Sequence, residues 1–117
     1  MKNIALSALA LAAIAVAPLA QAGDAAAGAE LATKKYACVS CHGEGMNKPV
    51  DPSYPKLAGQ YPEYIEQALV AYQKGTSTTG RGNAIMASQA KPLSRKEIAD
   101  IAAYIYSLQG DLQVGHR

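Results

Sequence analysis

The hydrophobic positions of this chain recur at helical spacing, and no run alternates in the way that a strand requires. Near the C-terminal end, five apolar residues form one stripe: Ile98, Ile101, Ala102, Ile105 and Leu108. This stripe predicts an amphipathic helix over residues 95–108. The preceding Ser94-Arg95-Lys96-Glu97 has the spacing of a capping box, so we expect this helix to be the best-defined one of the chain.

Two further segments read as main helices. Over residues 62–74, apolar residues recur at helical spacing, Pro62 suits a first helical position and Lys74-Gly75 reads as the stop. An alanine-rich stretch over residues 25–37 follows Asp24, a plausible N-cap, and is expected to run directly into the segment that begins at Cys38.

The connections between these helices are rich in proline, glycine and small polar residues. Residues 46–60 carry three prolines and should form an irregular loop, and residues 76–82 should form a second one. A short helical turn is expected within residues 83–90, where Met86 lies. Because no period-two pattern is present, the sequence predicts an all-α fold of three main helices plus loops.

The N-terminal segment is typical of a secretory signal peptide. Lys2 supplies the positive start, residues 4–16 form an apolar run, and Ala20-Gln21-Ala22 offers a small-x-small cleavage site. We therefore expect residues 1–22 to be removed and residues 23–117 to form one domain. The apolar run is short of the roughly 20 residues that span a bilayer, so no membrane insertion is expected after cleavage, and the periplasm is the expected location.

Charge and composition narrow the class of partner. Of eleven Lys and Arg residues only Lys2 lies in the leader, so the mature chain has ten basic against nine acidic side chains. This balance argues against a nucleic-acid partner, which would need a basic stripe. The chain contains no Phe and no Trp, which is lean for a stable core of this size and leaves room for a buried apolar cofactor.

One short stretch carries the chemistry: Cys38-Val39-Ser40-Cys41-His42. The C-x-x-C-H spacing is the attachment signature of a c-type haem. On a helix end, residues three and four apart share a face, so the two thiols can each bond one vinyl group of a single porphyrin. His42 then ligates the iron through a neutral imidazole nitrogen. The motif predicts one covalently bound haem c.

Three other uses of the two cysteines compete with haem attachment. A disulfide between Cys38 and Cys41 would close a very small loop, stabilise little and leave His42 unexplained. A thioredoxin-like thiol oxidoreductase expects a neighbouring βαβ pattern, which the chain lacks. A zinc site would need more ligands, and only His116 remains.

The second axial ligand of the iron decides the function. Met46 lies only four residues beyond His42, and so short a loop cannot easily carry its sulfur to the opposite face of the ring. Met86 lies forty-four residues beyond His42, after a whole helix, and its soft thioether suits iron in both oxidation states. A gap-filling core role for Met86, and ligation by His116 in the terminal tail, stay open.

At this point the chain resembles the class I c-type cytochromes, above all the small monohaem bacterial members and one half of the dihaem carriers. The resemblance covers nearly all of residues 24–108. It rests on four stretches: Cys38-Val39-Ser40-Cys41-His42-Gly43, Pro55-Lys56-Leu57-Ala58-Gly59-Gln60, Met86, and Leu93-Ser94 leading to Ala103-Tyr104-Ile105. It implies the class I fold wrapped around one haem.

The same resemblance implies a role for each matching residue. Cys38 and Cys41 would form the thioethers, and His42 and Met86 would be the axial ligands. Pro55 would offer its backbone carbonyl to Nδ1–H of His42, a bond that orients the ring; without the resemblance, Pro55 reads as loop stiffening.

The chain departs from the family at one point. In the family a glycine and an aromatic residue of the first helix, at set distances before the first cysteine, meet an aromatic residue of the last helix. Here Gly28 lies ten residues before Cys38, which is further than usual, and the aromatic residue is Tyr36. A helix crossing with Tyr104 is expected, and the first-helix residues that make it stay open.

These observations predict a periplasmic electron carrier that serves redox protein partners rather than an enzyme. Four lysines flank the motif and could steer an acidic partner or be an ordinary solvated surface: Lys34, Lys35, Lys48 and Lys56. The alternative is a five-coordinate haem enzyme or gas-binding haem protein in which Met86 only packs.

Overall fold

The computed structural model describes residues 22–111, and this part of the chain is helical without any strand. Most of the expected signal peptide, and the tail with His116, lie outside the described residues. The helices are α1 (Ala25–Glu30), α2 (Val39–His42), α3 (Pro62–Lys74), α4 (Ala84–Ala90) and α5 (Arg95–Ser107), with a π-helical turn over Leu31–Lys35 and a 3-10 turn over Glu44–Met46. The all-α prediction is confirmed.

Two of the predicted helices begin where expected and have the expected caps, and α5 ends at Ser107, one residue before the predicted end. At the start of α5, Glu97 N–H donates to the Ser94 hydroxyl (3.1 Å) and Ser94 N–H donates to a Glu97 carboxylate oxygen (2.9 Å), which completes the capping box. Helix α3 spans the predicted residues and ends at Gly75, whose φ of +61° suits glycine. Local signals were sufficient at both positions.

The first helix differs from the prediction. Asp24 is its N-cap, as predicted, and the Asp24 carboxylate accepts from the N–H groups of Ala26 and Ala27. The helix then widens into the π-helical turn, where Tyr36 N–H donates to the Leu31 carbonyl at 2.8 Å. Ala37 then adopts a φ of +49°, which breaks the chain direction. The helix therefore does not continue into Cys38, and the cysteine pair has the separate short helix α2.

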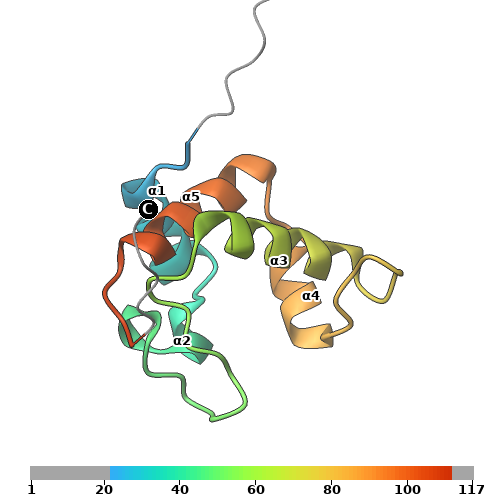
Figure 1. The fold of residues 1–117 in the computed structure, drawn as a ribbon, viewed down its shortest axis with the longest axis horizontal. Coiled ribbons are helices and arrows are strands. Elements are labelled where there is room, and N and C mark those ends of the chain that lie inside the picture. The colour runs from blue at the N-terminus through green and yellow to red at the C-terminus, as the bar shows by residue number, and fades with distance from the viewer. Residues whose placement is uncertain (1–21, 112–117) are drawn as a thin grey trace, which may run out of the picture.

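The crossing of α1 and α5 is the close approach that organises the fold (Figure 1). A Cβ atom added to Gly28 would lie 1.9 Å from the Asp100 carbonyl oxygen and 2.9 Å from Tyr104 Cβ, so only glycine fits there. Gly28 is thus the first-helix residue of the crossing. The π-helical turn holds one residue more than an α-helical turn, which accounts for part of the long spacing from Gly28 to Cys38.

The core between these helices is small. Helix α3 packs on α5 and α4, and ten buried residues form one cluster: Ala32, Met46, Ala58, Ile65, Ala90, Leu93, Ile98, Ile101, Ala102 and Ile105. Its largest fully buried side chains are Met46 and Ile98. The lean core expected from the composition is confirmed, because alanines take positions where larger side chains would bury more apolar surface. No helix among residues 22–111 is long and apolar enough to cross a membrane.

Candidate haem site

The motif lies on α2, a helix of one turn that is fixed at both ends by unusual backbone angles. Ala37 precedes it with a φ of +49°, and Gly43 follows it with a φ of +81°. A Cβ atom at Gly43 would lie 1.7 Å from the Lys48 carbonyl oxygen, so this glycine allows the next loop to fold back against the motif. The loop also closes on α2 through Val50 N–H, which donates to the Cys41 carbonyl (3.0 Å). Both cysteines and His42 are thereby held on one rigid turn.

The ring of His42 is buried, with 6% of the residue exposed, and its orientation is set by one contact. Nδ1 lies 2.9 Å from the Pro55 carbonyl oxygen. Because a carbonyl oxygen only accepts hydrogen bonds, Nδ1 carries the proton and Nε2 of the neutral ring keeps its lone pair for a metal. The Met46 carbonyl accepts from the N–H groups of Leu57 (2.8 Å) and Ala58 (3.1 Å), which anchors the loop that presents Pro55.

The two thiols do not have the features of a redox-active pair. Cys38 and Cys41 are free and half-buried, with no disulfide between them. Burial raises the pKa of the Cys38 thiol above its ordinary value, whereas a thiol oxidoreductase needs a lowered pKa that yields thiolate. Among residues 22–111, no three His, Cys, Asp or Glu side chains gather as a metal site. The thiol chemistry and the zinc alternative therefore gain no support.

The two methionines of the mature chain lie in different environments. Met46 has 0% of its surface exposed and belongs to the core cluster, so its side chain fills the interior. Met86 lies in the first turn of α4, half-buried, and its N–H donates to the Asn83 side chain that caps the helix (2.9 Å). The Gln73 side chain donates to the carbonyls of Ala90 (2.9 Å) and Leu93 (2.8 Å), which ties the end of α4 to α3.

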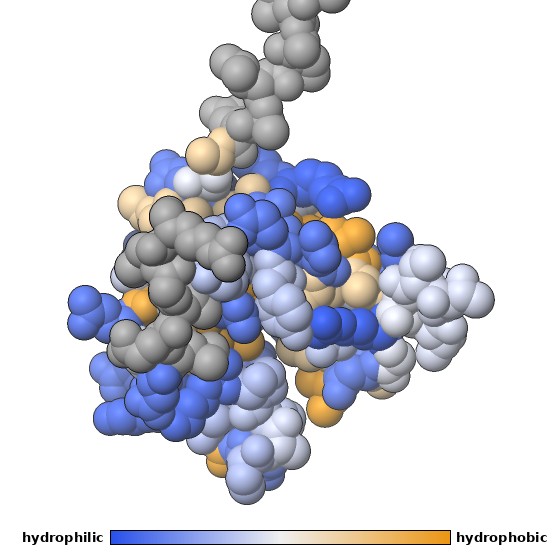
Figure 2. All heavy atoms as spheres, in the orientation of Figure 1, coloured by the Kyte–Doolittle hydropathy of each residue, from blue (hydrophilic) through white to orange (hydrophobic). Residues whose placement is uncertain are grey.

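The surface is hollowed between the part of the chain that carries the motif and the part that carries Met86. Helix α2 with its following loop lies on one side of the molecule and α4 on the other, with α3 across both (Figure 1). Figure 2 shows a notch in the surface between the two parts, with hydrophobic residues at the α4 side. The donors that the two parts offer are two thiols, an imidazole and a thioether, a set that suits haem c with iron.

Three of the four lysines that flank the motif form ion pairs, which the sequence did not indicate. Lys34 pairs with Glu30 (2.7 Å), Lys35 pairs with Glu97 (2.6 Å), and Lys56 pairs with Asp111. Within the described part of the chain, only Lys48 of the four has no acidic partner. Most of the positive charge beside the motif is thus locally balanced.

A surface cavity of about 520 Å³ lies along the outer face of α3, and it includes none of the predicted site residues. Arg81 and Arg95 contribute to it from either side. Arg81 also contacts Tyr64 and Tyr72 on α3, and the sequence analysis assigned no functional role to these three residues. The only sequence signal at Arg81 was its position in the loop shortly before Met86.

Over residues 22–111 the chain is helical, and it presents C-x-x-C-H on a short helix with a backbone carbonyl against the histidine ring, which is the arrangement of a c-type cytochrome. The family model for cytochrome c matches residues 25–109, and the chain therefore belongs to the cytochrome c family. Membership of this family implies one covalently bound haem c, and the class I fold is shown by the structural likeness below.

The chain is similar to several named cytochromes. It is 40% identical over 81 residues to cytochrome c4 of Azotobacter vinelandii, which covers 69% of this chain and 39% of that protein. It is 46% identical over 73 residues to cytochrome c-554(548) of Halomonas halodenitrificans, covering 62% of this chain and 83% of that protein.

Among solved structures, reduced recombinant cytochrome c4 from Pseudomonas stutzeri matches with a TM-score of 0.64 at 34% identity. The match covers 78% of this chain and 48% of that one. The chain thus spans less than half the length of the cytochrome c4 proteins that it matches.

Proposed function

We propose that this protein is a periplasmic one-electron carrier whose haem is bound through Cys38 and Cys41 and ligated by His42 and Met86. The observation that carries the proposal is the 2.9 Å contact between His42 Nδ1 and the Pro55 carbonyl oxygen. It leaves Nε2 as the metal-binding nitrogen, and it makes the imidazole a stronger donor because the N–H is partly shared with the carbonyl. Pro55 therefore acts through its backbone.

Different residues would hold different parts of the haem. Cys38 and Cys41 would supply the two thioether sulfurs from the half-buried face of α2, and Met86 would approach from α4, which Asn83 and Gln73 hold in place. When bound, haem c supplies an iron that cycles between ferrous and ferric states. The burial of Met46 in the core leaves Met86 as the thioether available at the notch.

Two protein ligands on the iron would leave no open position for substrate, which favours a carrier over an enzyme. The alternative is a five-coordinate haem enzyme or gas-binding haem protein in which Met86 only packs. The half-buried position of Met86, outside the core cluster, favours ligation over packing. The donor and acceptor would be redox proteins.

The location follows from the expected signal peptide. Residues 1–22 would direct export and be removed, so that the domain over residues 23–117 receives its haem in the periplasm. Mass spectrometry of the purified protein tests cleavage and attachment together, because loss of the leader and gain of one haem change the mass in opposite directions.

Ligation is tested by absorption spectra of the ferric and ferrous protein with and without carbon monoxide. The wild type is expected to bind carbon monoxide poorly at neutral pH, and Met86→Ala is expected to bind it readily. Met46→Leu, a volume-conserving change in the core, is the matched control and should keep the wild-type spectrum. Ready binding by the wild type would support the five-coordinate alternative.

A further inference from the structure

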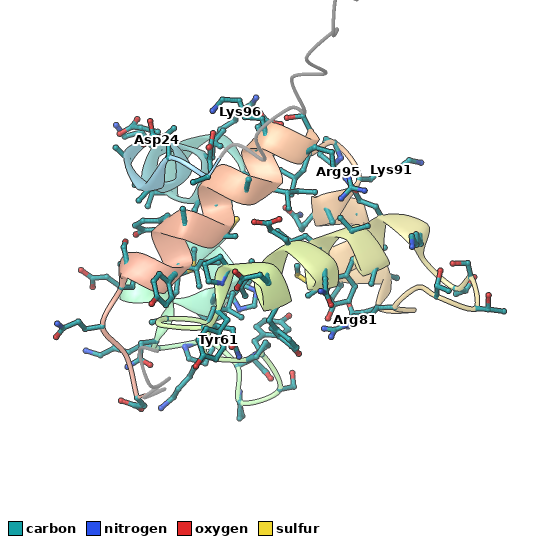
Figure 3. All side chains as sticks on the ribbon, turned by 45° about the horizontal axis from the view of Figure 1, so that its top comes forward. Asp24, Tyr61, Arg81, Lys91, Arg95 and Lys96 are labelled. Carbon is teal, nitrogen blue, oxygen red and sulfur yellow. The ribbon has the colours of Figure 1, made fainter. Side chains whose placement is uncertain are left out.

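The segment that follows α5 lies against the loop that carries Pro55. After Ser107 the chain leaves α5 and runs back beside this loop (Figure 1 and Figure 3), and we call residues 108–111 the strap. At Gly110 the strap comes so close to the loop that an added Cβ atom would lie 2.6 Å from Ala58 Cβ and 2.9 Å from the Ala58 carbonyl oxygen. Ala58 is fully buried and belongs to the core cluster, so the strap packs on the core at this point.

Asp111 ties the strap to the loop at two places. Its carboxylate accepts from the Asn47 side-chain amide (3.3 Å), and its backbone N–H donates to the Asn47 side-chain oxygen (3.2 Å), so these two residues form a reciprocal pair. The other carboxylate oxygen of Asp111 pairs with Lys56. The hydrogen bonds from Lys56 and Asn47 lower the pKa of Asp111 below its ordinary value, so the carboxylate is ionised at neutral pH. One side chain thus joins the start of the loop to the part that carries Pro55.

Both residues that Asp111 holds are next to residues that support the imidazole. Lys56 follows Pro55, whose carbonyl oxygen lies 2.9 Å from His42 Nδ1. Asn47 follows Met46, whose carbonyl anchors the far end of the same loop through two backbone hydrogen bonds. A movement of Lys56 would therefore move the carbonyl that sets the orientation of the His42 ring.

We propose that Asp111 is a positioning residue for the iron ligand, because through Lys56 it keeps the Pro55 carbonyl at hydrogen-bond distance from His42 Nδ1. The inference rests on the proposed ligation of the haem iron by His42. A carbonyl fixed at this distance takes a larger share of the Nδ1 proton, which makes Nε2 a stronger donor. A stronger donor favours ferric iron, so the strap would hold the reduction potential below the value that a loose loop would give.

Reduction potentials of the holoprotein can separate positioning from simple charge effects. Asp111→Asn removes a negative charge, Lys56→Met removes a positive charge and Asn47→Ala changes no charge, yet each loosens the strap. Positioning predicts that all three variants raise the potential. Charge alone predicts a higher potential for Asp111→Asn, a lower one for Lys56→Met, because a cation disfavours ferric iron, and no change for Asn47→Ala. A lowered potential for Lys56→Met, or an unchanged one for Asn47→Ala, would overturn the proposal.

Asp51 offers a matched control for the loss of one negative charge. It lies in the same loop, and its carboxylate accepts from Ser53 N–H at 2.8 Å rather than from the strap. Asp51→Asn should shift the potential less than Asp111→Asn does. The side chains of Lys56 and Asp111 are 48% and 64% exposed, so we expect the variants to fold, and thermal unfolding checks this.

NMR of the ferrous holoprotein follows the hydrogen bond itself. The His42 Nδ1 proton should exchange with solvent about tenfold faster in Asp111→Asn than in wild type, the scale set by a hydrogen bond to a charged group. Asp51→Asn should keep the wild-type exchange rate. A raised potential in Asp111→Asn with an unchanged exchange rate would show that the substitution acts by charge, and it would contradict positioning.

The same measurements distinguish a failure of this proposal from a failure of the carrier function. Wild-type protein that lacks covalent haem, or that binds carbon monoxide readily, would contradict the carrier function itself. Wild-type protein with attached, six-coordinate haem, together with strap variants that keep its potential and its Nδ1 exchange rate, would contradict only the role of Asp111.

Discussion

The crossing of α1 with α5 and the segments around the notch are built on different principles. At the crossing, two helices meet so closely that Gly28 has no room for a side chain, and the buried carboxylate of Asp100 accepts from Asp24 N–H at 2.8 Å and from Lys96 at 2.6 Å. Around the notch, α2 and α4 are short: the Asn83 side chain caps α4, whereas α2 has no side-chain cap and is tied to the next loop by the hydrogen bond from Val50 N–H to the Cys41 carbonyl. The crossing is stabilised by the polypeptide alone, whereas α2 and α4 bury little apolar surface of their own.

The contrast teaches where the cofactor contributes to stability. A short helix is unstable in isolation, and packing of an apolar face provides most of the stability of a helix in a protein. At the notch, that apolar face would be supplied by the porphyrin. The scaffold of α1 and α5 thus provides the frame, and the haem would complete the part of the core that the sequence leaves lean.

The largest effect is expected when haem attachment is prevented. In the double variant Cys38→Ala with Cys41→Ala, α2 and α4 should lose protection from hydrogen exchange, and the thermal transition should become broad or vanish. Amides of α5 should keep the most protection that remains. Wild-type protein from the same haem-loading host is the control. A double variant that unfolds cooperatively and keeps full protection in α2 and α4 would show that these helices do not depend on the haem.

A smaller but still large effect is expected at the helix crossing. Gly28→Ala would place a methyl group 1.9 Å from the Asp100 carbonyl oxygen, and forcing the helices apart should cost about 3 kcal/mol of the free energy of unfolding. Gly82→Ala, whose Cβ would have no neighbour closer than 3.6 Å, is the matched control and should change stability by less than about 0.5 kcal/mol. Denaturant unfolding of the holoprotein measures both variants.

The next effect concerns Glu97, which joins the start of α5 to the turn before the motif. Hydrogen bonds from Lys35 and Ser94 N–H lower the pKa of Glu97 from 4.5 to about 2. Because the pKa is depressed in the folded state, the stabilisation is complete above the unfolded value near 4.5 and is lost as pH falls toward 2. Glu97→Gln should cost about 1–2 kcal/mol at pH 7 and flatten the acid side of the stability curve.

Thermal unfolding from pH 2 to 7 would show whether this difference between wild type and Glu97→Gln narrows at low pH. Tyr36→Phe removes only the hydroxyl that lies 3.1 Å from each Glu97 oxygen, so it should have a smaller effect of the same kind. A constant difference across the range would show that the charge of Glu97 is not responsible.

The smallest effect is expected on the exposed surface beside the motif. Lys34 and Glu30 form an i, i+4 pair with 72% and 66% of their side chains exposed, so Lys34→Ala should cost no more than about 0.5 kcal/mol. Lys48→Ala removes the flanking lysine that has no acidic partner among residues 22–111, and it should change electron-transfer rates with an acidic redox protein more than Lys34→Ala does. Equal rate changes for the two variants would show that the ion pair with Glu30 does not reduce the attraction of Lys34 for an acidic redox protein.

Much of this protein could be predicted because its signals are local. The capping box at Ser94, the proline at the start of α3 and the spacing of Cys38, Cys41 and His42 each depend on residues a few positions apart, and each predicts the same result in any surrounding fold. The bounds of α3 and the position of α5 follow from them. The contact between His42 and Pro55 was available only through the family resemblance, because a proline in a loop has no local signal for its carbonyl.

The remaining features depend on residues far apart in the chain, and only the tertiary structure decides them. The sequence alone determined the helical class, the attachment motif and the lean core. The break at Ala37, the pairing of Lys35 with Glu97 and the contacts of Arg81 with two tyrosines of α3 arise because α1 must cross α5 at Gly28 while Cys38 stays at the notch. Local propensity favours a continuous helix there, and packing between distant helices overrides it because the crossing leaves room for glycine only.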